Sequence, residues 1–285
     1  AMAAHPRAFP ALLINMVKAG EVAGNLDETL NSAALFYERE NNTRKKVKSA
    51  LTYPVVVSIL AVFVTIFLLI KVVPQFVQIF ADFGAELPLP TRIVLGVSHF
   101  IQHQWYVLLL SSALLVVVYM ILNQYRHTKY YIDYIKLKIP VFGKLLQKAV
   151  IARFARTFSS LLTSAVPILQ ALTMVSQVVD NEAIAEPIRQ AKNNLRQGNA
   201  LHEPLKKYGV FPPLLTHMMA IGEETGALEE MLDKVADFYE SDVDNMTDQL
   251  KGLIEPLMIV FLAVIVGLIN LSVLLPMFEI YNLIG

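Results

Sequence analysis

His99 and His103 are four residues apart, so a helix would place both imidazole rings on one face, as in a pair of metal ligands. The surrounding segment supplies no evident third ligand. The chain has no cysteine, which excludes thiolate metal sites and disulfides. We therefore expect interfacial histidines here and no metal site.

Acid–base catalysis is a second possible chemistry, because His217 lies close in sequence to Glu223 and Glu224. The internal repeat described below weakens this hypothesis, since the equivalent position in the other copy is Asn15. The remaining candidates, His127 and His202, are isolated in the sequence.

Nucleotide chemistry is not indicated. Gly143-Lys144 lacks both the upstream glycine and the following hydroxyl residue of a phosphate-binding loop. We expect no enzyme and no bound cofactor, so any work that this protein assists must draw its energy from another subunit.

One stretch of the chain occurs twice. Phe9-Pro10 recurs as Phe211-Pro212, 202 residues later, and the same offset relates the two stretches up to Phe76 and Phe278 without a gap. Roughly a third of the aligned pairs are identical, which indicates a true repeat. Each copy is a short polar helical module followed by an apolar span.

Both copies contain the sequence Gly-Glu-x-x-Gly, as Gly20, Glu21 and Gly24 and as Gly222, Glu223 and Gly226. We expect a helix-hairpin turn, in which the first glycine ends one helix in the left-handed conformation and the second lets the next helix approach closely. The glutamate would satisfy free amides or favour the N-terminus of the next helix. Acidic pairs occupy the first turn that follows, Asp27-Glu28 and Glu229-Glu230, and a partner-binding acidic patch is the alternative interpretation.

The two copies differ in charge along the next helix. The second copy is acidic there, whereas the first turns basic. A solvated helix face would explain each. The functional hypothesis is that faces of opposite sign dock a partner or a second copy of the protein, with electrostatic matching setting register and encounter rate. The acidic residues are Glu229, Glu230, Asp233, Asp237, Glu240, Asp242, Asp244 and Asp248, and the basic ones are Arg44, Lys45, Lys46 and Lys48.

The composition favours a membrane protein. Hydrophobic residues make up 55% of the 285 residues and charged residues 17%, below the share in soluble domains. The formal net charge is zero, so a globally basic surface for nucleic acid is not indicated. Three apolar runs are long enough to cross a bilayer: Val55–Val73, Tyr106–Leu122 and Leu257–Leu275.

Basic flanks predict the orientation of these spans. Lys and Arg are dense before the first span and after the second, but the loop between them carries only Lys71 and Arg92, and the tail after the third carries none. We expect the N-terminus and the region 123–252 to be cytoplasmic and the C-terminus to be extracytoplasmic.

The sequence thus predicts an all-α, polytopic membrane protein with three transmembrane helices and two repeated cytoplasmic helical-bundle modules. Only eight residues precede the first copy, so we expect the first module to lack roughly fifty N-terminal residues that the second has. The expected parts are residues 1–54 (first module), 55–73 (span), 74–104 (extracytoplasmic loop), 105–122 (span), 123–254 (second module), 255–275 (span) and 276–285 (extracytoplasmic tail).

Helix signals in the second module are strong. Apolar residues between Ile151 and Leu162 recur at helical spacing. The other face is polar: Arg153, Arg156, Thr157, Ser159 and Ser160. Further helices are expected from Val166-Pro167 to about Val179, from Glu182 to Gln197 with Asn181 as cap and Gly198 as terminator, from Leu214 to Ile221, and from Leu228 toward the membrane.

The third span carries candidate interface residues. A carboxylate at the membrane boundary is costly unless paired, so Glu255, before Pro256, is the most suggestive acid, with anchoring by Lys251 as the simpler alternative. Gly267 and Asn270 give this span a small or polar face of the kind that packs against another helix.

Several of these segments together resemble the type II secretion system protein F family, the polytopic inner-membrane platforms of type II secretion machines, type IV pili and competence pseudopili. Ala165 departs from the pattern, since the family usually has glycine before Val-Pro. The matching segments are 9–38, 87–92, 139–143, 153–156 with Val166-Pro167, 211–240, and Glu255-Pro256.

The resemblance implies a non-enzymatic, oligomeric platform in the inner membrane. A cytoplasmic assembly or secretion ATPase would engage its soluble modules, and its membrane helices would contact pilin or pseudopilin subunits and other inner-membrane assembly proteins within the lipid. The alternative is an oligomeric transporter or channel whose path is lined by Asn270, Ser272 and Glu255, although three spans are few and show no inverted symmetry.

Overall fold

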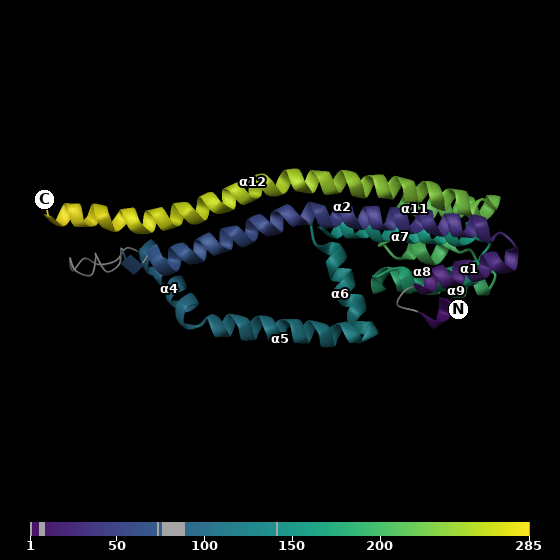
Figure 1. Ribbon diagram of the computed structural model, residues 1–285, viewed down its shortest axis with the longest axis horizontal. Helices are drawn as coiled ribbons and strands as arrows, with labels where there is room; N and C mark the ends of the chain where they lie inside the picture. The colour runs from purple at the N-terminus through teal and green to yellow at the C-terminus, as the bar shows by residue number, and fades with distance from the viewer. Residues whose placement is uncertain (1, 6–8, 73, 76–88, 141, 285) are drawn as a thin grey trace. The chain divides into compact units, whose positions relative to one another are not determined.

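The computed structural model describes residues 2–5, 9–72, 74–75, 89–140 and 142–284, and these residues form helices and connections without any strand (Figure 1). The chain divides into two units. Ala1–Val47 and Ile121–Thr247 make up the first, and Lys48–Met120 and Asp248–Gly285 the second. Two long helices, α2 (Leu26–Phe67) and α12 (Leu228–Ile284), each belong to both units.

The first unit is a helical bundle. Besides the first parts of α2 and α12 and a short 3₁₀ turn, η1 (Met2–Ala4), it contains α1 (Ala11–Ala23), α6 (Arg126–Lys138), α7 (Phe142–Thr163), α8 (Ile168–Val178), α9 (Glu182–Arg196), α10 (His202–Lys207) and α11 (Pro213–Thr225). Its core centres on α7, where Phe154 and Phe158 are fully buried. Ile184 of α9 and Leu232 of α12 complete the same apolar cluster.

Local sequence signals explain where several of these helices begin and end. The Asn181 side chain accepts a hydrogen bond from the Ile184 amide, 3.2 Å away, so the predicted cap of α9 is confirmed. Gly198 follows that helix with a left-handed φ of 79°. The helix α11 is longer than predicted, because it continues past Gly222 to Thr225.

The prediction that α7 has one apolar face and one solvent-facing polar face is wrong. Arg156, Thr157 and Ser159 are buried, since other helices cover that side as well. Only Arg153 and Ser160 of the five polar residues are partly exposed.

The second unit holds three helices that are long and apolar enough to cross a membrane. They are the second part of α2 with a π-helical turn η2 (Leu68–Val72), the helix α5 (Trp105–Gln124), and the second part of α12. The segment expected as a loop between the first two also contains a helix, α4 (Leu89–His103).

A polar contact supports the π-helical turn. A π turn changes the backbone bonds from i+4 to i+5, which frees a backbone carbonyl for another donor. The Ser98 hydroxyl of α4 donates to the Leu69 carbonyl at 2.6 Å, and Gln102 donates to Ser98. Leu69 and Ile269 form a small apolar cluster around this point with side chains of α4.

Candidate functional site

Two helical hairpins repeat with the offset seen in the sequence. The first consists of α1 and the start of α2, and the second of α11 and the start of α12 (Figure 1). The bounds of α1 (Ala11–Ala23) and of α11 (Pro213–Thr225) are 202 residues apart, as are the first residues of α2 and α12, Leu26 and Leu228. The two turns are therefore built alike.

The two glycines of each turn have roles opposite to those predicted. The second glycine ends the helix in the left-handed conformation, with φ of 74° at Gly24 and 73° at Gly226. The first permits the close approach. A Cβ on Gly222 would lie 2.7 Å from the Leu228 Cα, and one on Gly20 would lie 2.3 Å from the Thr29 hydroxyl oxygen.

The glutamate of the second turn binds an earlier helix than the one predicted. Glu223 accepts a hydrogen bond from the Leu201 amide at 2.7 Å, and its other carboxylate oxygen lies 2.9 Å from Nδ1 of His202. Glu223 therefore accepts the free backbone amide at the start of α10. It is also the partner of His202, which is isolated in the sequence. In the first turn Glu21 is exposed.

The strongest polar cluster of the first unit surrounds Arg156, whose side chain is only 7% exposed. The guanidinium donates to Asp233, Asp237 and Glu240 of α12, the bonds to Glu240 being 2.9 Å long. Burial alone would lower the pKa of Arg156, but the hydrogen bonds to Glu240 and Asp237 and the nearby negative charges raise the pKa above its usual value. The arginine is thus a fixed cation that holds α12 on α7.

The sequence did not single out Arg156 as a site residue. One signal was available: Arg156 lies between Phe154 and Phe158, two residues from each, and the acids of α12 that face it recur at helical spacing.

The faces of opposite charge pair with each other inside the chain. Arg39 of α2 donates to Asp237 at 2.9 Å, and Lys46 pairs with Asp244. Both pairs join residues that are 198 positions apart, so α2 and α12 run parallel in this unit. The repeat offset is 202 residues, so Arg39 and Lys46 each face a residue about one helical turn before their repeat equivalent. Two more pairs tie α7 to these helices, Arg153 with Glu40 at 2.8 Å and Lys148 with Asp242 at 2.7 Å.

The other predicted docking residues lie at the surface of the hairpins. Asp27, Glu28 and Lys45 are exposed. Glu229 accepts from the Thr163 hydroxyl at 2.8 Å, and Glu230 pairs with Lys234 of its own helix at 2.6 Å. The side chain of Arg44 lies outside the described residues.

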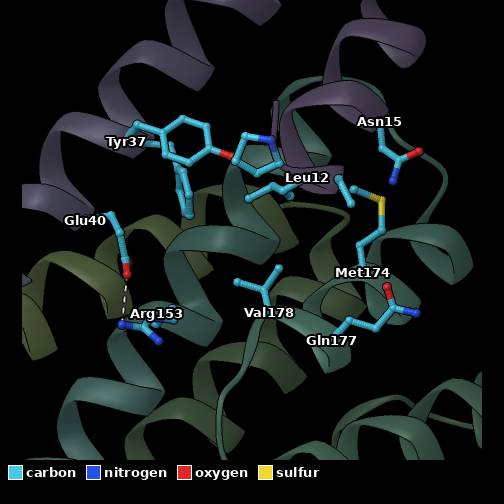
Figure 2. A pocket seen from close by; sticks show the side chains of 11 residues that line it. Leu12, Asn15, Tyr37, Glu40, Arg153, Met174, Gln177 and Val178 are labelled. Atoms are coloured by element: carbon cyan, nitrogen blue, oxygen red, sulfur yellow. Dashed lines mark ion pairs between the residues drawn. The ribbon is translucent and has the colours of Figure 1, made fainter. Parts of the chain in front are cut away.

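A cavity of about 300 Å³ lies where the first hairpin meets α7 and α8 (Figure 2). Leu12 and Met174 contribute apolar walls, and the ion pair between Glu40 and Arg153 stands at one side. Tyr37 also lines it, and burial raises the pKa of this phenol. The volume is at the lower end of small-molecule sites, and its lining shows no convergent set of reactive groups.

Metal-ligating side chains do not gather into a group of three or more anywhere in the described part of the chain. His99 and His103 stack on one face of α4 with ring centroids 4.5 Å apart. Among the candidates on the third span, Pro256 and Asn270 are exposed and Gly267 is half-buried, while the side chain of Glu255 lies outside the described residues.

Comparison with known proteins identifies the family. Residues 1–74 and 154–276 match the family described as type II secretion system (T2SS), protein F, and so both hairpins and the helices that continue from them are included. The chain belongs to this family.

Similar proteins carry two kinds of name. Type IV pilus assembly protein PilC of Thermus thermophilus is 45% identical over 273 residues, which cover 95% of this chain and 67% of the relative. PilC of Pseudomonas aeruginosa is 38% identical over 98% of this chain and 75% of its own length. Type II secretion system protein F of Aeromonas hydrophila is 34% identical over the whole of this chain and 73% of its own length.

Proposed function

We propose that this protein is an inner-membrane platform of a type II secretion or type IV pilus-like machine, which couples a cytoplasmic assembly ATPase to the extraction and polymerisation of pilin-like subunits. One observation carries the proposal. Each hairpin turns at a left-handed glycine into a helix, α2 or α12, that continues without a break into an apolar span. Family membership supports the same role.

The paired helices suit the transmission of force. A helix is stiff along its axis, and the ion pairs of Arg39 and Lys46 with α12 hold the two helices together. Arg156 fastens α12 to α7, so a displacement of the bundle would be passed to both helices at once. The protein itself would turn over no nucleotide and would act as a scaffold.

The proposed topology has the two helical modules, residues 1–54 and 123–254, in the cytoplasm. Spans at 55–73, 105–122 and 255–275 would leave the loop 74–104 and the tail 276–285 outside. The exposed acids of the turns, Asp27, Glu28 and Glu230, would face the ATPase, and the span around Gly267 and Asn270 would contact pilin, a second copy of the chain or other assembly proteins within the lipid.

Site-specific photocrosslinking tests this function. A benzoylphenylalanine at Glu28 or Glu230, in cells that express the machine, is expected to capture a motor ATPase, and one at Asn270 a pilin-like subunit or another membrane protein of the machine. The matched control is Lys207, an exposed residue at the end of α10. Capture of neither partner, or nucleotide turnover by the purified chain alone, would overturn the proposal.

A further inference from the structure

The helix α6 has an exposed apolar face, which none of the described residues of the first unit covers. Tyr131 is 54% exposed and Ile135 is 63% exposed, and both lie on one side of the helix because they are four residues apart. Large exposed side chains continue at both ends of α6, and together they make what we call the α6 face: Tyr125, Tyr131, Ile135, Ile139 and Phe142. Large apolar side chains that are exposed close together in the sequence are candidates for an interaction surface.

The opposite side of α6 is fixed to the bundle, so the α6 face cannot turn inward. Asp133 is buried and accepts hydrogen bonds from the Glu182 amide at 2.9 Å and from Lys136 at 2.8 Å. Tyr134 and Leu137 pack against the main apolar cluster. The exposed residues therefore point away from α7 and α9, on which α6 packs.

The place of α6 in the chain indicates what covers this face. The membrane-length helix α5 ends at Gln124 and α6 begins at Arg126. The residue between them, Tyr125, is extended with φ −88° and ψ 120°, so the chain changes direction there. A helix of 13 residues is about 20 Å long, and all of α6 follows directly from the end of a span.

One exposed base of α6, Lys138, suits an anionic lipid surface. Its one acid, Asp133, is buried, whereas its bases are Arg126, Lys129, Lys136 and Lys138. Three of these bases pair with acids of the first unit, Arg126 with Glu182, Lys129 with Asp180 and Lys136 with Asp133. Lys138 is exposed, and its Nζ lies 4.7 Å from the centre of the Tyr134 ring. Tyrosine beside apolar and basic residues is the composition of a helix that lies in the headgroup layer.

We propose that α6 is an interfacial helix that lies on the bilayer, with the α6 face inserted among the acyl chains and Lys138 at an anionic headgroup. The proposal rests on the proposed function in one respect, namely that α5 crosses the membrane. It adds a further attachment of the first unit to the lipid, besides the helices α2 and α12 that continue into spans.

Spin labelling tests the proposal sharply, because the chain contains no cysteine and every introduced thiol is unique. Labels at Tyr131→Cys and Ile135→Cys are measured in nanodiscs of phosphatidylcholine with and without phosphatidylglycerol. Collision with oxygen reports depth in lipid, and collision with a nickel chelate reports water. The matched control is Phe238→Cys, because Phe238 is an aromatic residue of the same unit that is 53% exposed.

We expect the labels at 131 and 135 to collide several-fold more often with oxygen than with the nickel chelate, and the label at 238 to show the reverse. Phosphatidylglycerol should increase the oxygen preference further. Nickel accessibility at 135 equal to that at 238 would overturn the proposal, as would dipolar broadening between labels at 135, which would mean that a second copy covers the face. A label at Leu115→Cys on α5 separates the two ideas: a water-exposed label there would contradict the membrane topology itself.

Discussion

The two hairpins have matching helix bounds and turns but bury different faces. In the first, Phe36 is 4% exposed and Leu30 is 46% exposed. At the equivalent positions of the second, Phe238 is 53% exposed and Leu232 is fully buried. Each hairpin therefore has two apolar faces, and the neighbouring helices decide which one becomes core.

The two hairpins use different residues to pack into the same apolar cluster. The second hairpin packs through Leu228, Leu232 and Tyr239 in the bundle with α7, and the first packs through Leu12, Met16 and Phe36 in the same cluster. Of the three acids that bind Arg156, two exist only in the second copy, where Asp233 and Asp237 stand in place of Asn31 and Leu35, while Glu240 has an acidic equivalent in Glu38. A repeat thus retains its turn geometry while its surfaces specialise.

The largest contrast is expected at the aromatic pair. Phe36→Ala should lower the free energy of unfolding by about 3–5 kcal/mol because it empties a buried site, whereas Phe238→Ala should cost less than about 1 kcal/mol. Denaturant unfolding of the purified chain in detergent, followed by circular dichroism, measures both. Equal losses would mean that the two faces are equally covered.

The leucine pair should show the reverse order between the hairpins. Leu232→Ala is expected to cost about 2–5 kcal/mol, and Leu30→Ala less than about 1 kcal/mol because solvent already reaches that side chain. The same unfolding assay applies. A large loss for Leu30→Ala would show that another molecule covers this face of the first hairpin in the preparation.

The glutamates of the two turns should differ in their contribution to stability, by a smaller amount. Glu223→Ala removes the acceptor of the Leu201 amide and the partner of His202, so it should cost about 1–2 kcal/mol. Glu21→Ala changes an exposed side chain and should be close to neutral. Hydrogen exchange at the Leu201 amide gives a local measurement, and unchanged protection in Glu223→Ala would refute this role.

The helix-ending glycines should behave alike in the two hairpins. Gly24→Ala and Gly226→Ala should each cost about 1 kcal/mol, since both residues have left-handed φ and an added Cβ would meet no atom within 4 Å. Asparagine at either position should cost less than alanine. Thermal unfolding of the four variants tests this, and unequal losses would show that the turns are not equivalent.

The smallest expected effect is a gain at Ala165, the only non-glycine residue with positive φ in the described part of the chain, at 56°. Ala165→Gly relieves that conformation but gives the unfolded chain more freedom, so the net stabilisation should be at most about 1 kcal/mol. A lower melting temperature in this variant would contradict the explanation.

Features set by local interactions were predictable from the sequence. The cap at Asn181, the helix boundary at Gly198 and the three apolar helices follow from a few neighbouring residues each, and the structure has them.

Features set by tertiary packing were not predictable in this way. Phe36 and Phe238 occur in the same local sequence, Phe-Tyr-Glu, so no local pattern distinguishes the buried ring from the exposed one. The burial of Arg156 depends on acids 77 to 84 residues away. The sequence prediction assigned the two turn glycines the wrong way round, because either glycine can end a helix. In the second turn, the position of Leu228 determines that Gly222 is the residue that cannot carry a side chain.

The stagger between α2 and α12 has an evolutionary consequence. Identical helices that pair in register would place every residue opposite its own duplicate, so each charge would meet a like charge. With a displacement of one turn, Arg39 meets Asp237 while the duplicate of Arg39 is Ser241. A helix that carries bases and acids one turn apart could therefore pair with its own duplicate, and a later substitution in either copy would change one contact at a time.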